Sequence, residues 1–369
     1  MIQVFHVVFF NVVIYFTILF LLYPTLNGRK VNNQKYWFAV FLFFLFCLFP
    51  AWGGDYFHYR EAFRVLKNGY FSHMEEVYIY IVKNIANTYF EFRLIVWGGA
   101  AYLLLKTFKN LSLDSKIALC VFCLLFMPRF SYARVSLAMV LGFFGASIIL
   151  KHFNFWRLIT GLVLIGVSFF FHKTAAFGIG VILLSFLLNR FLNKKVIILL
   201  IALIPVMIII LENTLTSFVD LDLADLEGLN IANGQRYLGD EIEQTGLGTR
   251  ISDYLMRLSY YSILIEYVLF HIKGLYKGLP SSMKVFSTSS FLIILFASLF
   301  IFDLGFSTGL IYNRFMYFAM IPSGCFIAFC VKEKYFPKWT KFVLLMGIVS
   351  CSYALVYSLY LSMNSPYQW

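Results

Sequence analysis

Two long apolar stretches, each with positive charges near its middle, constrain the fold more than any other feature of this sequence. The first runs from Ile117 to Leu150, and its only charged residues are Arg129 and Arg134. The second runs from Leu158 to Leu188 and is interrupted only by His172-Lys173. A helix needs about 20 residues to cross a membrane, so neither stretch has room for two full-length spans and a connecting loop. We therefore expect two short helical hairpins whose tips lie below the membrane surface.

The charges at these tips predict a polar cavity sunk into one leaflet. An arginine that faced lipid at this depth would cost roughly 3 kcal/mol or more. Such side chains avoid that cost by facing water or a polar partner. We therefore expect Arg129, Arg134, His172 and Lys173 to line a water-filled hollow.

Composition agrees with a membrane protein that crosses the bilayer many times. The chain is 61% hydrophobic and 13% charged, whereas soluble domains are about 25% charged. The prediction is a single all-α integral-membrane domain over residues 1–369, with about twelve transmembrane helices. No Lys or Arg cluster precedes the first apolar run, so it is expected to remain as a helix instead of being cleaved. All six cysteines fall inside apolar runs, and we interpret them as packing residues and not as zinc ligands.

The distribution of charge predicts the orientation in the membrane. Alternate loops are rich in Lys and Arg, which places them in the cytoplasm by the positive-inside rule. The other ends of the helices, with Arg129, Arg134, His172 and Arg314, then lie on the outer face, as do both termini. The basic positions are Arg29, Lys30, Lys35, Lys106, Lys109, Lys116, Lys151, Arg157, Arg190, Lys194, Lys195, Lys273, Lys277, Lys284, Lys332, Lys334, Lys338 and Lys341.

Taken in order, the chain predicts helices separated by two polar segments. Residues 53–91 are amphipathic and are expected to form helices on the outer surface, and 212–250 is expected to be an outer acidic loop. Pro128 removes a backbone donor and favours a break in its helix. The spans outside the two hairpins are expected at about 4–23, 36–52, 92–108 and 196–211, from 251, at 285–302, from 312, and at 342–363.

Several basic residues on the predicted outer side suit a diphosphate, because a guanidinium group binds phosphate oxygens in a bidentate manner. Arg250, Tyr254 and Arg257 share one helical face by their spacing. The alternative, that these cations pair with local acids or phospholipid headgroups, stays open. The basic set is Arg129, Arg134, Lys173, Arg250, Arg257 and Arg314.

Candidate catalytic groups are a carboxylate or a neutral imidazole, because either can accept a proton from a sugar hydroxyl. Asp55 and His172 are the predicted catalytic residues, and Glu76 is a third candidate for the base. Polar aromatic residues near Asp55 suit a sugar, although tyrosines at a membrane interface are equally expected. Asp220-Leu221-Asp222 has the form of a metal-binding DxD, but such spacing is common in acidic loops, and no metal is predicted. The predicted substrate contacts are Tyr56, Tyr59, Arg60, Glu76, Arg250, Tyr254, Tyr312 and Tyr317.

Four short motifs in this order resemble the EpsG family of Wzy-type polysaccharide polymerases. They are Gly53-Gly54-Asp55 with Tyr56 and Tyr59, Arg134-Val135-Ser136-Leu137-Ala138, Phe171-His172-Lys173-Thr174-Ala175, and Tyr312-Asn313-Arg314-Phe315 with Tyr317-Phe318. The resemblance implies a GT-C-like membrane glycosyltransferase that joins undecaprenyl-diphosphate-linked repeat units on the outer face of the bacterial inner membrane. It also implies inversion at the anomeric carbon and no cofactor. Where the family commonly has Arg-Gln, this chain has Arg134-Val135, so no amide contact is expected at position 135.

Two other functions remain open at this stage. An O-antigen ligase would transfer a finished chain to a lipid A core, and a flippase or exporter would move lipid-linked oligosaccharide without catalysis. A transporter needs acids deep within its helices, and Glu266 is nearly alone there, which argues against transport. The expected partners are undecaprenyl-diphosphate-linked oligosaccharides and membrane lipids, with a chain-length regulator and a flippase as candidate protein partners and no nucleic acid.

Overall fold

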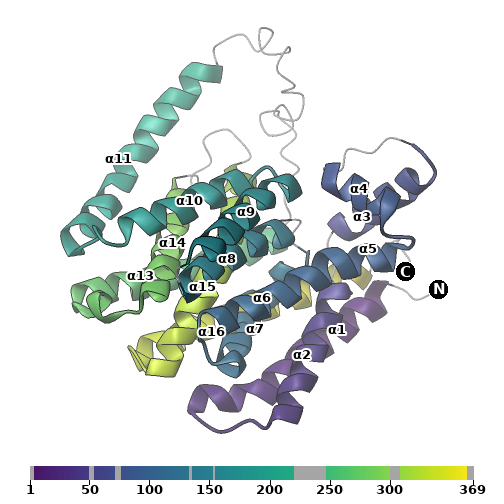
Figure 1. Ribbon diagram of the computed structural model, residues 1–369, viewed down its shortest axis with the longest axis horizontal. Coiled ribbons are helices and arrows are strands. Elements are labelled where there is room, and N and C mark those ends of the chain that lie inside the picture. The colour runs from purple at the N-terminus through teal and green to yellow at the C-terminus, as the bar shows by residue number, and fades with distance from the viewer. Residues whose placement is uncertain are drawn as a thin grey trace.

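The described part of the chain is entirely helical (Figure 1). The structure is a computed structural model that describes residues 4–49, 54–70, 76–132, 135–152, 154–219, 247–299 and 308–363. For residues 54–58, 131–132, 211–219, 247–249 and 308–314 it describes the backbone only. No strand occurs within these ranges, so the predicted all-α class is confirmed for them.

The first half of the chain forms two long helices, a group of short helices and the helices of the central core. These are α1 (Val4–Leu22), η1 (Tyr23–Asn27), α2 (Asn33–Leu48), α3 (Gly54–Lys67), α4 (Glu76–Asn84), α5 (Tyr89–Arg93), η2 (Leu94–Gly98), α6 (Gly99–Asn110), α7 (Ser115–Tyr132) and α8 (Ser136–Lys151). The second half contains α9 (Phe155–Phe171), α10 (Ala175–Leu188), α11 (Lys194–Val219), α13 (Leu247–Ile272), η4 (Leu275–Gly278), α14 (Ser281–Ser298), α15 (Thr308–Glu333) and α16 (Pro337–Met363).

Each predicted span contains a helix, and several of these helices are long and apolar enough to cross a membrane. Among the described residues, four segments meet both conditions: Val4–Asn27, Ser281–Ser298, Phe315–Glu333 and Pro337–Met363. Four further helices are apolar but shorter: Asn33–Leu48, Ser136–Lys151, Phe155–Phe171 and Ala175–Leu188. The membrane class is thus supported, whereas twelve crossings stay a prediction.

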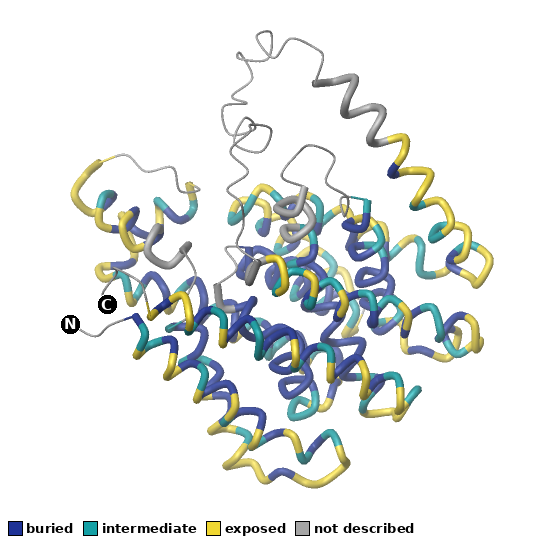
Figure 2. Tube along the Cα trace, turned by 180° about the vertical axis from the view of Figure 1, so that it is seen from behind, coloured by how far each residue is buried: buried dark blue, intermediate teal, exposed yellow. Residues whose placement is uncertain are grey.

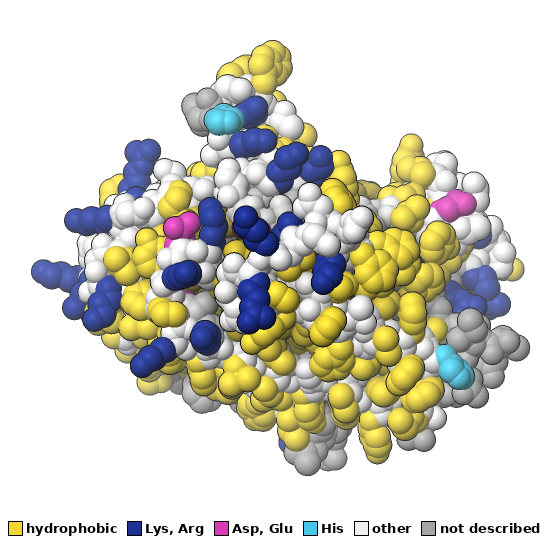
Figure 3. Space-filling model, turned by 90° about the horizontal axis from the view of Figure 1, so that it is seen from below, with side chains coloured by type: hydrophobic (Ala, Val, Ile, Leu, Met, Phe, Trp, Pro, Cys, Tyr) yellow, Lys and Arg dark blue, Asp and Glu magenta, His cyan; other side chains and the backbone are white. Residues whose placement is uncertain are grey.

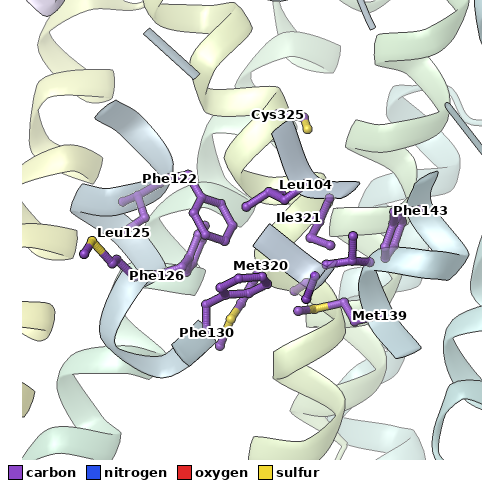
Figure 4. Packing of buried hydrophobic residues seen from close by; sticks show 14 of the residues in the cluster. Leu104, Phe122, Leu125, Phe126, Phe130, Met139, Phe143, Met320, Ile321 and Cys325 are labelled. Atoms are coloured by element: carbon purple, nitrogen blue, oxygen red, sulfur yellow. The ribbon is translucent and has the colours of Figure 1, made fainter. Parts of the chain in front are cut away.

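Helix α7 lies at the centre of the core, which explains why its sequence has no polar face. Its side chains from Ala118 to Phe130 are all buried. Phe122 and Phe126 of α7 pack with Met320 and Ile321 of α15, while Leu104 of α6 and Phe143 of α8 complete the same cluster (Figure 4). A helix that is apolar all round is stable only where other helices surround it.

The break predicted at Pro128 is wrong, because α7 continues through Pro128 to Tyr132. The proline removes only one helical donor, and it does so in the penultimate turn, where the loss affects little of the helix. The carbonyl that loses this donor belongs to Leu124, and Gly347 of α16 approaches it closely: a Cβ at position 347 would lie 3.1 Å from that oxygen. Tight packing on all sides therefore keeps the helix continuous.

Each predicted hairpin contains two short helices, α7 with α8 and α9 with α10, but the two helices of a hairpin are not each other's main packing partners. The close approach is between α8 and α9 and not within α7–α8, since a Cβ at Gly145 would lie 2.6 Å from the carbonyl oxygen of Gly161. Small residues allow helix backbones to meet in this way. Helix α7 instead packs against α15 and α16, and α10 packs against α14.

The acidic loop predicted at 212–250 is shorter than expected. Helix α11 continues to Val219 and α13 begins at Leu247, so both ends of that segment are helical. No Gly or Pro occurs between Leu211 and Val219, so polar side chains alone do not stop the helix. Helix α11 lies at the periphery, and most of its described side chains are exposed in Figure 2. Residues 220–246, which include Asp220 and Asp222, lie outside the described residues.

Within the predicted amphipathic segment at 53–91, the described residues form α3, α4 and the start of α5, and α3 has one buried face. In α3, Tyr59, Ala62, Phe63 and Leu66 are buried, and Arg60, Glu61, Arg64 and Lys67 are exposed between them. This spacing is that of a helix with one apolar stripe. Figure 1 places α3 and α4 near the start of α1 and the end of α16, away from the α1–α2 turn. They therefore cover the end of the bundle opposite that turn.

Lys and Arg side chains gather at the other end. Figure 3 views the molecule from below, the side toward which the α1–α2 and α15–α16 turns project in Figure 1, and many basic side chains lie on that face. The alternate loops that are rich in Lys and Arg in the sequence thus correspond to one basic end of the molecule. Which side of a membrane this end occupies stays a prediction.

Candidate functional site

The predicted site residues lie on elements that meet away from the basic end. The backbone of Asp55 and Tyr56 lies in the first turn of α3, and that of Tyr312 and Arg314 in the first two turns of α15. Arg134 lies outside the described residues. The remaining predicted residues are described with their side chains.

Arg129 joins α7 to α13. Its side chain is only 4% exposed, and its Nη2 donates to the carbonyl oxygen of Ser252 at 3.2 Å and contacts the Ser252 hydroxyl oxygen at 3.5 Å. A buried guanidinium group requires such polar contacts, because an uncompensated charge would be costly. The contact brings Arg129 next to the part of α13 that lies between Arg250 and Arg257. The sequence placed these cations in one set, and the fold brings two parts of that set together.

On α13 itself, Arg257 lies over the ring of Tyr254. The guanidinium carbon is 5.6 Å from the ring centroid, which is the geometry of a cation–π interaction. The predicted shared face of α13 is thus confirmed for Tyr254 and Arg257. The side chains of Tyr254 and Arg250 on this helix are exposed, with Tyr254 64% exposed.

His172 connects α9 to α10 and is fixed by its neighbour Thr174. The Nδ1 atom of His172 accepts a hydrogen bond from the backbone N–H of Thr174 at 3.2 Å and lies 2.7 Å from the Thr174 hydroxyl oxygen. Because a backbone N–H can only donate, Nδ1 is the acceptor in this contact, which corresponds to the tautomer with its proton on Nε2. His172 is partly buried, whereas Lys173 is exposed.

Aromatic contacts connect the His172 segment to α15. The rings of Phe177 and Phe315 have centroids 4.2 Å apart, and Phe315 follows Arg314 directly. Tyr260 of α13 donates its hydroxyl to the carbonyl oxygen of Met316 at 2.9 Å. Helix α15 is therefore held near Arg314 by α10 on one side and by α13 on another. Tyr317 lies partly buried at the same level.

The outer-surface helices join the same assembly. Tyr78 of α4 packs on Phe171, the residue before His172, with centroids 5.9 Å apart. Tyr59 of α3 packs on Tyr78 at 6.1 Å and is only 3% exposed. Glu76 begins α4 and is exposed, as is Arg60. Contacts next to the predicted residues thus link α3, α4, α9, α10, α15, α13 and α7, and the ring of Tyr59 contributes to this packing.

Arg93, which was not among the residues predicted from the sequence, is buried at the junction of α5 and η2. It is 2% exposed, its Nε donates to the carbonyl oxygen of Leu48 at 2.6 Å, and its Nη2 donates to that of Cys47 at 2.7 Å. Its guanidinium carbon lies 4.3 Å from the ring centroid of Trp97. The available signal was an arginine beside an apolar helix with a tryptophan four positions on.

The structure provides no grouping typical of a metal centre within its described ranges, where no three His, Cys, Asp or Glu side chains come together. All six cysteines are buried with free thiols, which confirms their prediction as packing residues. Many large apolar side chains, such as Phe20 and Trp156, are instead exposed on the outer surface of the helices. Such a surface is stable in lipid and unfavourable in water.

The fold and the site together define an all-helical membrane protein that gathers arginine, histidine and aromatic residues at one end of its helices. The family model described as the EpsG family matches residues 34–369. The chain therefore belongs to the EpsG family, the family of Wzy-type polymerases. Comparison with curated proteins and with solved structures gives no match.

Proposed function

We propose that this protein polymerises lipid-linked oligosaccharide repeat units at the outer face of the bacterial inner membrane, with undecaprenyl diphosphate as the leaving group. The observation that carries this proposal is the EpsG match over residues 34–369, because that range includes every motif stretch and every candidate site residue. The buried arginine on α7 and the contacts that link the motif-bearing helices support it. The proposed architecture has twelve spans, a GT-C-like fold, and both termini outside.

In this proposal the lipid diphosphate binds to Arg134 and Arg314. Arg129, Lys173 and Arg257 contribute further positive charge. Guanidinium groups fixed before the reaction stabilise the charge that develops on the departing phosphate oxygen. Support comes from the contacts of Phe177 and Tyr260 with α15, which bring the segments that carry Lys173 and Arg257 to the helix of Arg314. The proposed sugar contacts are Tyr56, Arg60, Glu76, Arg250, Tyr254, Tyr312 and Tyr317. Tyr59, which the sequence also predicted as a contact, is buried among aromatic rings and is left out of this set.

The reaction is a displacement at an anomeric carbon. A hydroxyl oxygen of the acceptor repeat unit attacks that carbon and forms the new glycosidic bond. The bond from carbon to phosphate oxygen breaks, and its electron pair leaves with the lipid diphosphate. A single displacement of this kind inverts the configuration, and the proposal includes no metal or other cofactor.

Asp55 is assigned as the base that accepts the proton of the attacking hydroxyl. His172 is assigned as a hydrogen-bond donor, because its Nδ1 accepts from Thr174 and its Nε2 carries the proton. An Nε2–H group suits a phosphate oxygen or the oxygen of the leaving group. This division gives the two predicted catalytic residues different roles.

The experiment uses the full chain purified in detergent and a synthetic repeat unit linked to undecaprenyl diphosphate. The expected result is a ladder of longer lipid-linked chains with no lipid A acceptor present and no gradient across a membrane. A ligase would need the lipid A acceptor, and a flippase would lengthen nothing under these conditions. Absence of extension from every repeat unit native to the source cell would overturn the proposal.

A further inference from the structure

One short stretch of the chain, α5 with η2, contacts both elements that flank Gly53-Gly54-Asp55. Helix α2 ends just before this motif and α3 begins within it. Both pack against residues 89–97. The end of α2 and helix α3 are therefore held by the same stretch.

The end of α2 is fixed through its last carbonyl groups. Helix α2 stops at Leu48 because Phe49 precedes Pro50, and a residue before proline avoids helical geometry. Arg93 donates to the carbonyl oxygens of Cys47 and Leu48, and the side-chain amide of Asn11 donates to that of Phe49. A cation at this position also interacts favourably with the negative end of the helix dipole. Three successive carbonyls before the motif thus have side-chain donors.

Helix α3 is fixed through aromatic packing that starts at Tyr59, in its second turn. The ring of Tyr59 lies 6.0 Å from that of Trp97 and 6.4 Å from that of Phe92, measured between centroids. Phe63, one turn further along α3, lies 6.1 Å from Phe92. All four rings belong to the buried core. The second and third turns of α3 are therefore held against the residues next to Arg93.

The local structure of α5 and η2 explains how one stretch makes both contacts. Thr88 caps α5 by accepting from the backbone N–H of Glu91 at 3.2 Å, and the Glu91 carboxylate accepts from the N–H of Asn87 at 2.6 Å. The chain then widens into one π-helical turn, Leu94–Gly98. Such turns are rare within helices and often occur at functional sites. Here Arg93 lies over Trp97, and the pair faces α2 and α3.

We propose that Arg93 is a positioning residue that, with Trp97, holds the end of α2 and helix α3, and with them the backbone of Asp55, in place for the reaction. The inference rests on the proposed function, since it assigns Asp55 a catalytic role. Arg93 is 2% exposed and its donors bind backbone carbonyls, so it acts through the main chain and does not touch the substrate. A displacement of about 1 Å at a reacting group lowers a rate by on the order of a hundredfold.

The test compares Arg93→Gln and Arg93→Lys with Arg64→Gln as a matched control. Arg64 lies on α3 with its side chain 72% exposed and pairs with Glu61 one turn away, so the same substitution there leaves the α2 end intact. Two readouts are measured on the purified full chain: kcat and KM for a lipid-linked repeat unit, and hydrogen–deuterium exchange of backbone residues 47–60. Melting temperature and monodispersity establish that each variant is folded.

Arg93→Gln is expected to raise exchange over residues 47–60 and to lower kcat by on the order of a hundredfold, with KM within about twofold of the parent. Arg93→Lys keeps one charged donor and is expected to recover part of both effects. A folded Arg93→Gln variant with unchanged exchange, or with unchanged kcat, overturns the inference. Loss of stability alone, with normal kcat per folded molecule, would identify Arg93 as a purely structural cap.

Failure of the proposed function has a different signature. In that case the parent protein extends no chain, while Arg93→Gln still raises exchange over residues 47–60. If the parent is active and Asp55→Asn remains active too, the catalytic assignment of Asp55 is wrong, and so is the inference that depends on it. The exchange measurement requires no substrate, so the two failures are distinguished in one set of samples.

Discussion

Phe177 of α10 and Phe315 of α15 lie with their ring centroids 4.2 Å apart, although 138 positions separate them in the numbering of the chain. Phe177 is one turn beyond Lys173, and Phe315 follows Arg314. This contact brings two motifs that the sequence could only place in order along the chain to one region of the bundle. The interface between α10 and α15 therefore controls the geometry of the proposed diphosphate site.

The first prediction concerns Gly178, which allows this interface to close. A Cβ at position 178 would overlap the ring of Phe318, so Gly178→Ala pushes α10 away from α15. Overpacking of this kind costs about 1–3 kcal/mol. The expected results are a lower melting temperature in detergent and a loss of chain extension on the order of a hundredfold.

Gly180 lies on the same helix and provides the matched control, because a Cβ at position 180 would meet no other atom within 4 Å. Gly180→Ala should preserve activity and leave the melting temperature unchanged or slightly raised, since alanine favours helix. Equal behaviour of the two alanine variants would contradict the role assigned to the interface.

The second prediction tests the arginines proposed to bind the diphosphate. Loss of either Arg134 or Arg314 should raise the barrier by about 3 kcal/mol, which corresponds to about a hundredfold in rate. Arg134→Ala and Arg314→Ala are measured for chain extension in membranes, with Arg190→Ala as the control. Arg190 is exposed beyond the end of α10, at the predicted cytoplasmic side. Normal polymerisation by both site variants would rule the assignment out.

The third prediction separates the roles of Asp55 and His172. Asp55→Asn removes the base and should lower kcat by about a hundredfold to ten-thousandfold. His172→Gln supplies an amide N–H near the position of Nε2–H, so it should retain much more activity than His172→Ala. If glutamine and alanine at this position are equally inactive, His172 is not the donor proposed here.

The fourth prediction concerns a buried contact at the basic end of the helices. Thr340 of α16 donates its hydroxyl to an oxygen of Glu266 on α13 at 2.6 Å, and Glu266 is fully buried. Thr340→Val removes this donor and should lower stability by about 1–3 kcal/mol, measured as thermal unfolding in detergent. Thr340→Ser keeps the hydroxyl and should behave as the parent does. An unchanged melting temperature for Thr340→Val would show that the contact contributes nothing.

The positions of the helices were largely predictable from the sequence, because apolar length and charged turns are local properties of the chain. Helix α1 was expected at about 4–23 and lies at Val4–Leu22, and α16 occupies the predicted final span. Whether the helix breaks at Pro128, in contrast, was not decided by a local property of the chain. Whether a proline ends a helix depends on what packs around it, and at Pro128 the answer comes from α15 and α16.

Which helices pack against each other could not be predicted from the sequence, for a similar reason. Two adjacent apolar helices suggest a hairpin, but the choice between α7–α8 and α8–α9 depends on whether small residues on the two partners coincide in space. Gly145 of α8 and Gly161 of α9 lie against each other, and this depends on the register and crossing angle of the two helices. The spacing of residues along the chain does not encode this register or this crossing angle.

Features of the site also divide into those that the sequence predicted and those that only the structure revealed. The sequence by itself determined the membrane class, the basic and non-basic ends, and the residue types suited to a diphosphate and a sugar, because hydropathy and charge act at each position separately. Only the tertiary structure decided that Arg129 contacts Ser252 and that Arg93 holds the end of α2. Each of these depends on a hydrogen bond whose direction and partner exist only after the helices have packed.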